Sequence, residues 1–513
     1  MTATIVHLSR MLVWGRRLAR HGALRPFEDP RAPRSIRLVA RIARIGTGAP
    51  QTPDFAAGLG AVGPAAVKLG QALATRPDLI GIEAATDLVR LQDSLPPLPF
   101  SALEASLNAG LGGPWQERFE SIDPVAIGAA SMAQVHRGVT RDGRAVAIKM
   151  LRPGIEATLA TAIDTYEWAA GHIELLGGEF ARLRPRAVIA TFKGWTEAEL
   201  DLRREAASAS ELAEILLGEP DFVVPAVDWG LSSRRTLVID WIDGIKLSDT
   251  AALAALDFDR RKLAEVLVHG FLAQAIAQGF FHADMHQGNL FVIPPRDGHS
   301  ARIGVIDFGI MGRINRRARM YLAEILFGLV TGNYKRVAEI HFEAGYVPGH
   351  HNVGAFATAL RSVGEPIRGK RAKDIAITDL LEGLFAITRS FDMAVQPHLL
   401  LLQKTMVMVE GVALTLDPHV NMWEVAEPYV RDWVRDEMGP EAVIADRLVE
   451  NARALAQLPR ILRQWVAANP IPGAAPDAPP LPPLPARRQR AGWSSIWLVI
   501  AAAAGAAAMQ FLG

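Results

Sequence analysis

The sequence contains no cysteine among its 513 residues. This absence excludes disulfide scaffolds, thiolate zinc sites, iron–sulfur clusters and cysteine nucleophiles. Neither sign of charge is in clear excess. The sequence has 55 Lys and Arg residues and 54 Asp and Glu residues, which gives a net charge of +1. Such a balance argues against wholesale binding of nucleic acid, although it permits a local basic patch.

Length and composition predict a globular protein with two or more domains. The chain is too long for one ordinary core, and its 50% of hydrophobic and 21% of charged residues exclude bulk disorder. Helical periodicity covers about 55–110, 155–218 and 258–465, whereas strand-like alternation is found mainly at Met132–Met150, with a turn at Asp142-Gly143, and at Thr236–Ile242. A small sheet is therefore expected before a large helical part.

Both ends of the chain carry membrane signals. The N-terminal segment is rich in arginine, with no secretory signal peptide, and predicts either a basic amphipathic helix on an anionic membrane or a helix packed on the protein body. After a proline-rich linker, residues 493–512 run about 20 positions without a charge, long enough to span a bilayer. Arginines before this span predict the cytoplasmic face of a membrane. The alternative is a buried or self-associating alanine-rich helix.

Two stretches in the predicted sheet have features of a phosphate site. Lys149 lies on a strand face lined by small side chains, where a flat base could lie on Ala147 while the lysine reaches a phosphate. A nearby loop lacks bulk, as a phosphate loop requires, and consists of Gly128, Ala129, Ala130 and Ser131. Taken alone, the two are more typical of a solvated lysine and a tight turn.

Acidic residues follow in the stretch Glu199–Glu205, which is predicted to be one helix. Asp201 and Glu205 are four residues apart and would share a helix face, where Lys149 could supply the cation between them. The alternative is a solvated acidic face.

A third group of polar residues has the chemistry of a magnesium site. Asp284, Asn289 five residues later, and Asp307 after an apolar run supply the hard oxygen ligands that Mg²⁺ prefers. Asp284 would accept a hydroxyl proton or orient a nucleophile, while Asn289 and Asp307 would hold the metal. A zinc site at His282 and His286 would need a helix, which the nearby glycines disfavour.

The order of these parts carries more weight than any one of them. A lysine on a strand, a glutamate on a following helix, then D-x-x-x-x-N and D-F-G form the ordered set of kinase-type phosphoryl transfer.

More specific motifs accompany that set. They are Lys68-Leu-Gly70-Gln71, the Ala-rich loop at Gly128–Ser131, Glu199-Leu-Asp201, and the run from His282 to Asn289. With them the chain resembles, over roughly residues 50–425, the AarF/UbiB family of atypical protein-kinase-like proteins, which is linked to ubiquinone biosynthesis. Gly70 interrupts a helical stretch at a cost of about 1 kcal/mol against alanine, which predicts a close backbone approach. Gly128, where the family usually has alanine, predicts a looser loop, and Met285 and Gln287 in place of prolines predict a softer catalytic loop.

The resemblance implies an α+β, protein-kinase-like two-lobe fold with an N-terminal helical K-x-G-Q extension, to which the sequence adds a C-terminal transmembrane helix. The predicted parts are the basic segment 1–50, the extension 51–115, the N-lobe 116–242, the helical C-lobe 243–466, the linker 467–492 and the span 493–512.

The resemblance also implies roles for individual residues. Asp284, Lys149 and Glu205 are the expected catalytic residues, with Lys149 paired to Glu205, and Asn289 and Asp307 are the expected Mg²⁺ ligands. ATP is expected to contact the loop Gly128–Ser131, Ala147, Lys149, Asp240 and Ile242. Lys68, Gln71, Glu199 and Asp201 are expected to be regulatory, with Lys68 facing Glu199.

The function implied by this resemblance is a membrane-attached kinase or ATPase that uses Mg²⁺ and ATP to support ubiquinone biosynthesis, acting on lipid precursors or on a biosynthetic complex. Expected partners are a membrane lipid or quinone precursor, quinone biosynthesis enzymes and a second copy of the chain, but not nucleic acid. The alternatives are a nucleotide-gated scaffold without catalysis and a small-molecule phosphotransferase.

Overall fold

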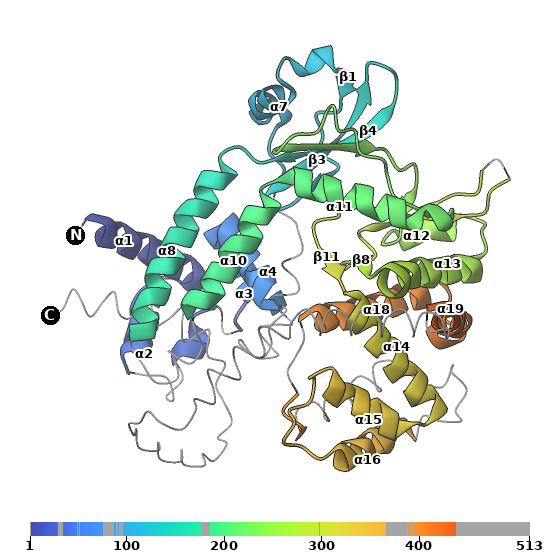
Figure 1. The fold of residues 1–513 in the computed structure, drawn as a ribbon. Coiled ribbons are helices and arrows are strands. Elements are labelled where there is room, and N and C mark those ends of the chain that lie inside the picture. The colour runs from blue at the N-terminus through green and yellow to red at the C-terminus, as the bar shows by residue number, and fades with distance from the viewer. Residues whose placement is uncertain are drawn as a thin grey trace, which may run out of the picture. The chain divides into compact units, whose positions relative to one another are not determined.

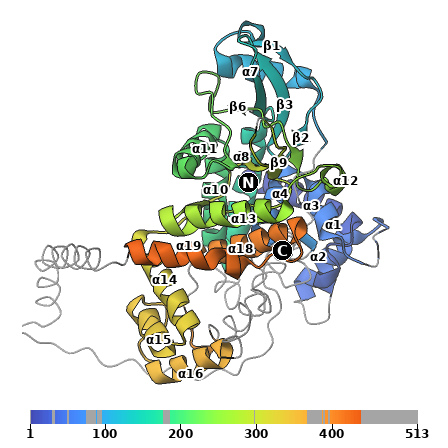
Figure 2. The same cartoon turned by 90° about the vertical axis from the view of Figure 1, so that its right-hand side faces the viewer.

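The computed structural model describes residues 2–28, 34–48, 50, 52–74, 87–88, 91, 96–175, 185–296, 298–365, 387, 390–393 and 397–437. The described residues form two compact units: those of 2–210 with Ala226–Trp241, and Glu211–Pro225 with those of 242–437. Figures 1 and 2 show the helices and strands from two directions. Each unit combines strands with helices, which fits a kinase-like two-lobe α+β fold.

The first unit contains a five-stranded antiparallel sheet in the order β1-β3-β4-β6, with β2 paired to β3. The strands are β1 (Phe119–Ile122), β2 (Gly128–Ala129), β3 (Ala133–Thr140), β4 (Ala145–Leu151) and β6 (Thr236–Asp240). Gly143 closes the β3–β4 turn with a φ of 83°, so the predicted hairpin is confirmed. Alternation along β4 buries Val146, Ile148 and Met150 and leaves Lys149 on the opposite face.

The helices of this unit begin near the N-terminus and end at the border with the second unit. They are α1 (Thr2–Arg20), α2 (Arg34–Arg44), α3 (Phe55–Val62), α4 (Pro64–Ala74), α7 (Glu104–Leu111), α8 (Ile155–Leu175), α10 (Pro185–Glu199) and α11 (Leu202–Ile215). Single 3-10 turns are η1 (Arg25–Glu28), η2 (Phe100–Ala102), η3 (Trp115–Glu117) and η4 (Leu216–Gly218), the last in the second unit.

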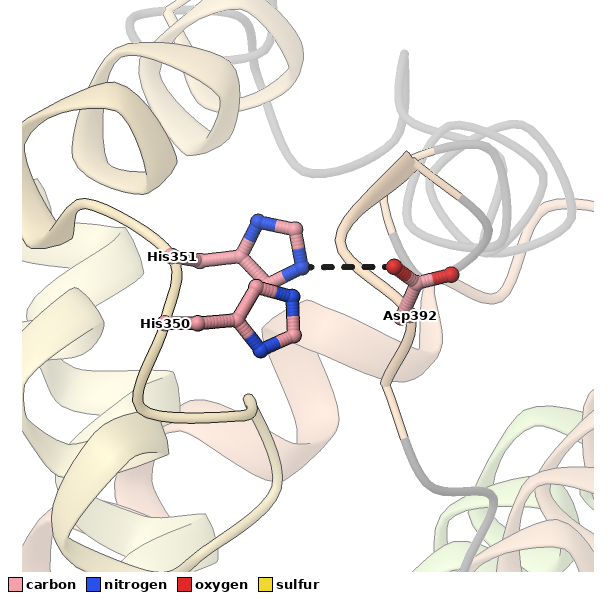
Figure 3. A group of neighbouring side chains, drawn as sticks. All are labelled: His350, His351 and Asp392. Atoms are coloured by element: carbon pink, nitrogen blue, oxygen red, sulfur yellow. Dashed lines mark ion pairs between the residues drawn. The ribbon is translucent and has the colours of Figure 1, made fainter. Parts of the chain in front are cut away.

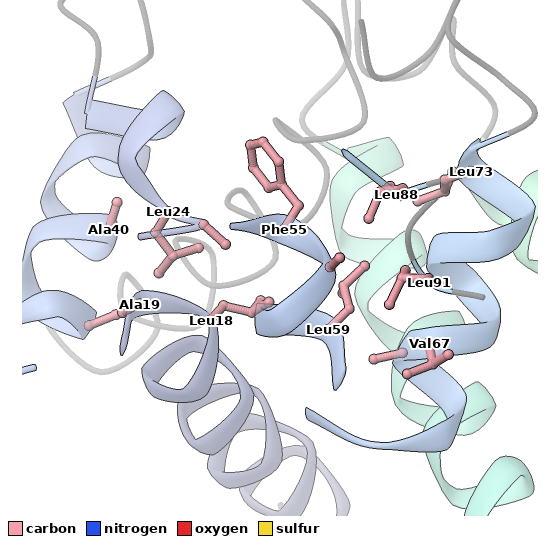
Figure 4. Packing of buried hydrophobic residues seen from close by; sticks show 14 of the residues in the cluster. Leu18, Ala19, Leu24, Ala40, Phe55, Leu59, Val67, Leu73, Leu88 and Leu91 are labelled. Carbon is pink, nitrogen blue, oxygen red and sulfur yellow. The ribbon is translucent and has the colours of Figure 1, made fainter. Parts of the chain in front are cut away.

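The N-terminal helices share one hydrophobic core (Figure 4), which joins α1, α2, α3, α4 and α8 through residues such as Leu18, Ala40, Phe55, Val67 and Ile173. The predicted close approach at Gly70 is present in this core. A Cβ atom at Gly70 would lie 2.4 Å from Cδ1 of Leu91 and 2.6 Å from Cδ1 of Leu59. The helical cost of this glycine is therefore offset by tight packing.

Helix α1 packs on the body of the first unit. Nδ1 of His7 lies 3.2 Å from Oγ1 of Thr165 in α8, and Leu18 is buried against α3. Its outer face exposes Ile5 and Leu12. Of the two interpretations left open by the sequence, packing on the body is observed, and membrane contact stays a prediction.

The second unit contains two small sheets and a set of helices. One sheet has the order β5-β10-β9-β7 and the other pairs β11 with β8. Their strands are β5 (Phe222–Val223), β7 (Ile245–Lys246), β8 (Phe280–His282), β9 (Leu290–Ile293), β10 (Arg302–Val305) and β11 (Met311–Arg313). Helical periodicity dominates the sequence from about residue 258 onward, but over 280–313 the structure has short strands, which carry the polar motifs. One of them, β10, is the apolar run that precedes Asp307.

Helices precede and follow these strands. They are α12 (Thr250–Ala254), α13 (Arg260–Leu272), α14 (Arg316–Thr331), α15 (Tyr334–Glu343), α16 (Val353–Gly364), α18 (Pro397–Leu416) and α19 (Met422–Glu437). A π-helical turn, η5 (Ala273–Gln278), leads from α13 toward β8. Figure 2 shows α18 and α19 alongside α13, which contacts both.

The predicted C-terminal transmembrane helix is the part of the expected fold that needs correction. Within the described ranges, no helix combines the length and the apolar character needed to cross a membrane. Helix α8 has 21 residues, for example, but carries Glu156, Asp164 and Glu167, which are costly in hydrocarbon. The stretch 493–512 and the linker 467–492 lie outside the described residues.

Candidate functional site

Lys149 and Glu205 form the pair that the resemblance implies. Nζ of Lys149, on β4, donates to Oε1 and Oε2 of Glu205, on α11, at 2.7 and 2.9 Å. The lysine side chain is 21% exposed and the glutamate side chain 9% exposed. Because the carboxylate is nearly buried, loss of one partner would leave a poorly solvated charge. The pair holds an ammonium group at a fixed point of the sheet.

The expected phosphate loop follows the same sheet. Gly128 and Ala129 form β2, and the backbone N–H of Ala130 donates to the carbonyl oxygen of Ala133 at 2.8 Å. Ser131 is buried. Gly128 does not have a positive φ, and a Cβ atom there would meet nothing within 4 Å. The backbone at Gly128 therefore does not depend on the conformational freedom of glycine.

Three further residues, Ala147, Asp240 and Ile242, are expected to contact the nucleotide, and each has different neighbours in the structure. Ala147 pairs with Ile239 across β4 and β6 and is half-buried. Asp240 ends β6, where its Oδ1 lies 3.4 Å from Nη1 of Arg144. Ile242 belongs to the second unit and lies over Gly304 of β10.

The residues expected to be regulatory form two ion pairs and a tether in the first unit. Lys68 of α4 lies 2.6 Å from Glu199 of α10, as the resemblance implies. Nε2 of Gln71 donates to the carbonyl oxygen of Leu91 at 2.8 Å. Asp201 instead pairs with Arg203 at 2.6 Å, and hydrogen bonds from Arg203 lower the pKa of Asp201.

The expectation of one helix over residues 199–205 is wrong, because α10 ends at Glu199 and α11 begins at Leu202. The carboxylate of Asp201 accepts the backbone N–H of Arg203 at 3.2 Å, the kind of local bond that interrupts a helix and starts the next. Asp201 and Glu205 therefore do not share a continuous helix face. The two glutamates on either side of this break have different partners. Glu199, at the end of α10, pairs with Lys68, and Glu205, on α11, pairs with Lys149.

In the second unit, His282 is the centre of a hydrogen-bond network. Its Nε2 lies 3.1 Å from the carbonyl oxygen of Ile306 and 2.8 Å from that of Asp307, while its Nδ1 accepts the backbone N–H of Asp284 at 3.2 Å. Burial lowers the pKa of His282, which agrees with a neutral ring that donates from Nε2. The backbone N–H of His282 donates to Oε1 of the buried Gln274 in the π-helical turn. His282 thus ties the segment that contains Asp284 to the D-F-G segment.

The three residues predicted for magnesium chemistry belong to this same network, Asp284 and Asp307 through backbone atoms and Asn289 through its side-chain amide. Nδ2 of Asn289 donates to the carbonyl oxygen of Asp284 at 3.1 Å, and the N–H of Ile306 donates to the carbonyl oxygen of Asn289 at 3.0 Å. Asp307 adopts a left-handed backbone with a φ of 64°, which is uncommon outside glycine and typical of functional sites. The structure therefore brings Asp284, Asn289 and Asp307 together.

The zinc interpretation of His282 and His286 is not supported. His282 ends strand β8, so the helix that the spacing needs is absent here, and both ring nitrogens of His282 have protein partners. Nε2 of His286 instead lies 3.5 Å from Oδ2 of Asp284.

Helix α18 contributes two contacts that sequence reasoning missed. Nζ of Lys404 lies 3.2 Å from Oδ1 of Asp284, and Nε2 of Gln287 donates to Oγ1 of Thr415 at 2.9 Å. Met285 is fully buried. The residues that replace prolines in this loop are therefore packed or tethered. No sequence motif includes Lys404. Its partner, Asp284, lies 120 residues earlier in the chain, so a local pattern does not connect the two.

Comparisons with known proteins cover both units. The family model described as the ABC1 atypical kinase-like domain matches residues 90–341, and the one described as the UbiB helical domain matches residues 360–421. The first range contains Lys149, Glu205 and the Asp284 network, and the second contains Lys404. The "Probable protein kinase UbiB" of Marinobacter nauticus is 39% identical over 383 residues, which cover 75% of this chain and 70% of that protein.

Two solved structures are also similar. The complex of Rv3197 with erythromycin from Mycobacterium tuberculosis has a TM-score of 0.48 and 26% identity, with coverage of 71% of this chain and 91% of that chain. The Rio2 kinase–ADP/Mg²⁺–phosphoaspartate complex from Chaetomium thermophilum has a TM-score of 0.27 and 12% identity, with coverage of 64% and 95%.

Proposed function

Because this chain belongs to the UbiB family of atypical protein-kinase-like proteins, we propose that it binds ATP with Mg²⁺ and transfers the terminal phosphoryl group to water or to an acceptor. This activity would support ubiquinone biosynthesis by driving the handling of a lipid precursor or of a biosynthetic complex. The observation that carries the proposal is the single network that joins Asp284, Asn289 and Asp307 through His282 and backbone groups.

Each polar group of the network has a distinct task in this proposal. Asp284 accepts the proton of the attacking water or hydroxyl group as the new bond to phosphorus forms and ADP leaves. Nδ2 of Asn289 is engaged by the carbonyl oxygen of Asp284, which leaves its amide oxygen as the atom suited to a cation. The carboxylate of Asp307 adds a second hard oxygen donor. These donors fit Mg²⁺, which when bound would neutralise charge on the phosphate oxygens.

The first unit supplies a cation for the nucleotide phosphates. Lys149 is held by Glu205 at 2.7 Å, so its ammonium group is positioned before any ligand arrives. The lysine keeps a 21% exposed side chain, and Ala147 beside it on the same strand face leaves room for a flat base.

The test of this proposal is ATP turnover by the purified full chain, with and without lipid vesicles and phenolic quinone-precursor analogues. We expect Asp284→Asn to bind ATP within about threefold of the parent affinity and to lose at least about 100-fold in turnover. Asp164→Asn, an exposed carboxylate on α8, is the control and should behave as the parent. Parent-like hydrolysis by Asp284→Asn would remove Asp284 from the mechanism. Complementation of a quinone auxotroph by a silent Asp284→Asn variant would favour the scaffold instead.

A lipid surface is the proposed partner of the N-terminal helices. Helix α1 exposes Leu12 among arginines, and α2 with the residue after it exposes Leu38, Ile42 and Ile45. Apolar side chains beside basic ones favour the surface of an anionic membrane. We expect Leu38→Glu with Ile45→Glu to reduce sedimentation with anionic vesicles, while Leu217→Glu, at a still more exposed leucine of the second unit, should not. Unchanged sedimentation of the double variant would contradict this assignment.

A further inference from the structure

Two histidines and an aspartate come together in the second unit, outside every motif described above. His350 and His351 lie in the loop between α15 and α16, and Asp392 lies in the segment before α18. Their donor atoms all lie within 4.8 Å of one another. Figure 3 shows both imidazole rings directed toward the carboxylate.

A turn explains why the two neighbouring histidines point the same way. The backbone N–H of His351 donates to the carbonyl oxygen of Pro348 at 3.1 Å and closes a four-residue turn. In an extended segment adjacent side chains would point to opposite sides. Here the two rings lie 4.2 Å apart at 37°. The chain therefore presents two imidazoles to one point.

The unsatisfied ring nitrogen of His351 is an independent sign of a missing ligand. Its Nε2 is shielded from solvent and makes no hydrogen bond with any residue in the described parts of the chain. It faces Oδ2 of Asp392 at 3.5 Å, beyond the roughly 2.7–2.9 Å of a charge-assisted hydrogen bond. Two ligands on a tetrahedral ion with arms of about 2.1 Å are separated by about 3.4 Å. The gap between these atoms thus has the span of a shared metal ion.

We propose that His350, His351 and Asp392 bind one divalent transition-metal ion, with zinc as the best fit and water in the fourth position. Two imidazole nitrogens and a carboxylate oxygen form a zinc-type donor set, whereas Mg²⁺ and Ca²⁺ prefer oxygen alone. No cysteine elsewhere in the chain offers a competing thiolate site. His350 and Asp392 are both exposed, so rotation of their side chains can bring the donor atoms to bonding distance.

The ion acts as a clip between two segments of the helical part. Phe391 lies beside Asp392. The centroid of its ring is 5.3 Å from that of the His351 ring and 4.9 Å from that of the Phe356 ring in α16. The two linked residues, His351 and Asp392, are separated by about 40 residues. Closing a loop of this length restricts the conformations of the unfolded chain. Because the site exists only when these segments are folded, zinc binding stabilises the second unit.

The test uses the full chain after treatment with a chelator. Zinc is titrated against a chromophoric competitor, and the melting temperature is recorded with and without zinc. We expect one zinc ion per chain at this site and an upward shift in melting temperature at about 100-fold excess over Kd. His351→Ala and Asp392→Asn should each weaken zinc binding by at least about 10-fold and abolish the shift. His419→Ala, an exposed histidine outside the cluster, should match the parent.

One further variant and one further measurement cover the case in which a variant does not fold. His350→Ala changes an exposed side chain, so it tests the site even where His351→Ala folds poorly, and the zinc-free melting temperature of each variant reports folding directly. Parent-like zinc affinity in His350→Ala and Asp392→Asn would overturn the proposal and leave an ordinary histidine–aspartate ion pair. These readouts do not depend on ATP turnover, so they stand apart from the proposed function.

Discussion

The ammonium group of Lys404 lies 3.2 Å from Oδ1 of Asp284, although 120 residues separate the two in sequence. The other carboxylate oxygen of Asp284 faces Nε2 of His286 at 3.5 Å. The carboxylate proposed to accept a proton is therefore held from the helical domain on one side and from its own loop on the other. Helix α18 thus takes part in positioning the loop that contains Asp284.

Lys404→Met should lower the turnover of ATP by about 10- to 100-fold, because the ammonium group of Lys404 holds the carboxylate of Asp284 in position for proton transfer. The Kd for ATP should change by less than about threefold, and Lys404→Arg should recover part of the turnover. Initial-rate kinetics on the full chain measure the turnover, and nucleotide titration measures the Kd. Lys335→Met, an exposed lysine on α15, is the matched control. An unchanged kcat in Lys404→Met would show that the contact serves stability alone.

Glu205→Gln should weaken ATP binding and stability together. The substitution removes the charge that holds Lys149, and the lysine then loses its fixed position on β4. Because Glu205 is 9% exposed, we expect a loss of about 1–3 kcal/mol in the free energy of unfolding. Denaturant titration and nucleotide titration measure the two effects.

The control for that substitution is Glu167→Gln, which breaks a pair of exposed residues with Lys193 and should cost less than about 1 kcal/mol. Equal losses in Glu205→Gln and Glu167→Gln would mean that burial adds nothing to the Lys149–Glu205 pair.

Local sequence patterns were sufficient for the parts of the site that depend on neighbours in the chain. Alternation along β4 placed Lys149 opposite the buried Val146 and Ile148, and the Asp142-Gly143 signal located the hairpin. The order of lysine, glutamate, D-x-x-x-x-N and D-F-G pointed to the kinase-like fold. The first two features follow from strand period and turn chemistry, which act over a few residues. The motif order needs only the sequence itself.

Other features depend on contacts that no local pattern contains. Lys404 reaches Asp284 because α18 packs on other elements of the second unit, α13 among them, and helical spacing cannot say which distant carboxylate a lysine meets. The helix break at Asp201 went unpredicted because the acidic spacing around it is also typical of a continuous helix. The apolar run before Asp307 was recognised in the sequence, whereas β8 and β9 are short apolar runs, which periodicity does not distinguish from helix.

Gly70→Ala should destabilise the first unit, because its Cβ atom would lie 2.4 Å from Leu91 and 2.6 Å from Leu59. Side-chain shifts of this kind in a packed core cost about 1–3 kcal/mol, more than alanine gains in helix propensity. Thermal or denaturant unfolding of the full chain measures the loss. Gly128→Ala is the matched control, since its Cβ atom meets open space, and its stability should stay within about 0.5 kcal/mol of the parent. A Gly70→Ala variant as stable as Gly128→Ala would contradict the tight packing.

The stability of the second unit should fall as the pH drops below about 6.5, the ordinary pKa of histidine. Burial lowers the pKa of His341, whose Nδ1 donates to the carbonyl oxygen of Val337 at 2.7 Å, and burial lowers the pKa of His282 as well. Below about 6.5 the unfolded chain binds protons that the folded chain resists, so the free energy of unfolding decreases until the lowered folded pKa is reached.

Denaturant titrations between pH values of about 5.5 and 7.5 test this dependence. His341→Gln removes one of the two rings of the described second unit whose pKa is lowered by burial. It should flatten the slope without abolishing it, because His282 still titrates. The control, His419→Gln, changes an exposed ring and should leave the slope as in the parent. A slope unchanged in His341→Gln would show that protonation of this ring is not linked to unfolding.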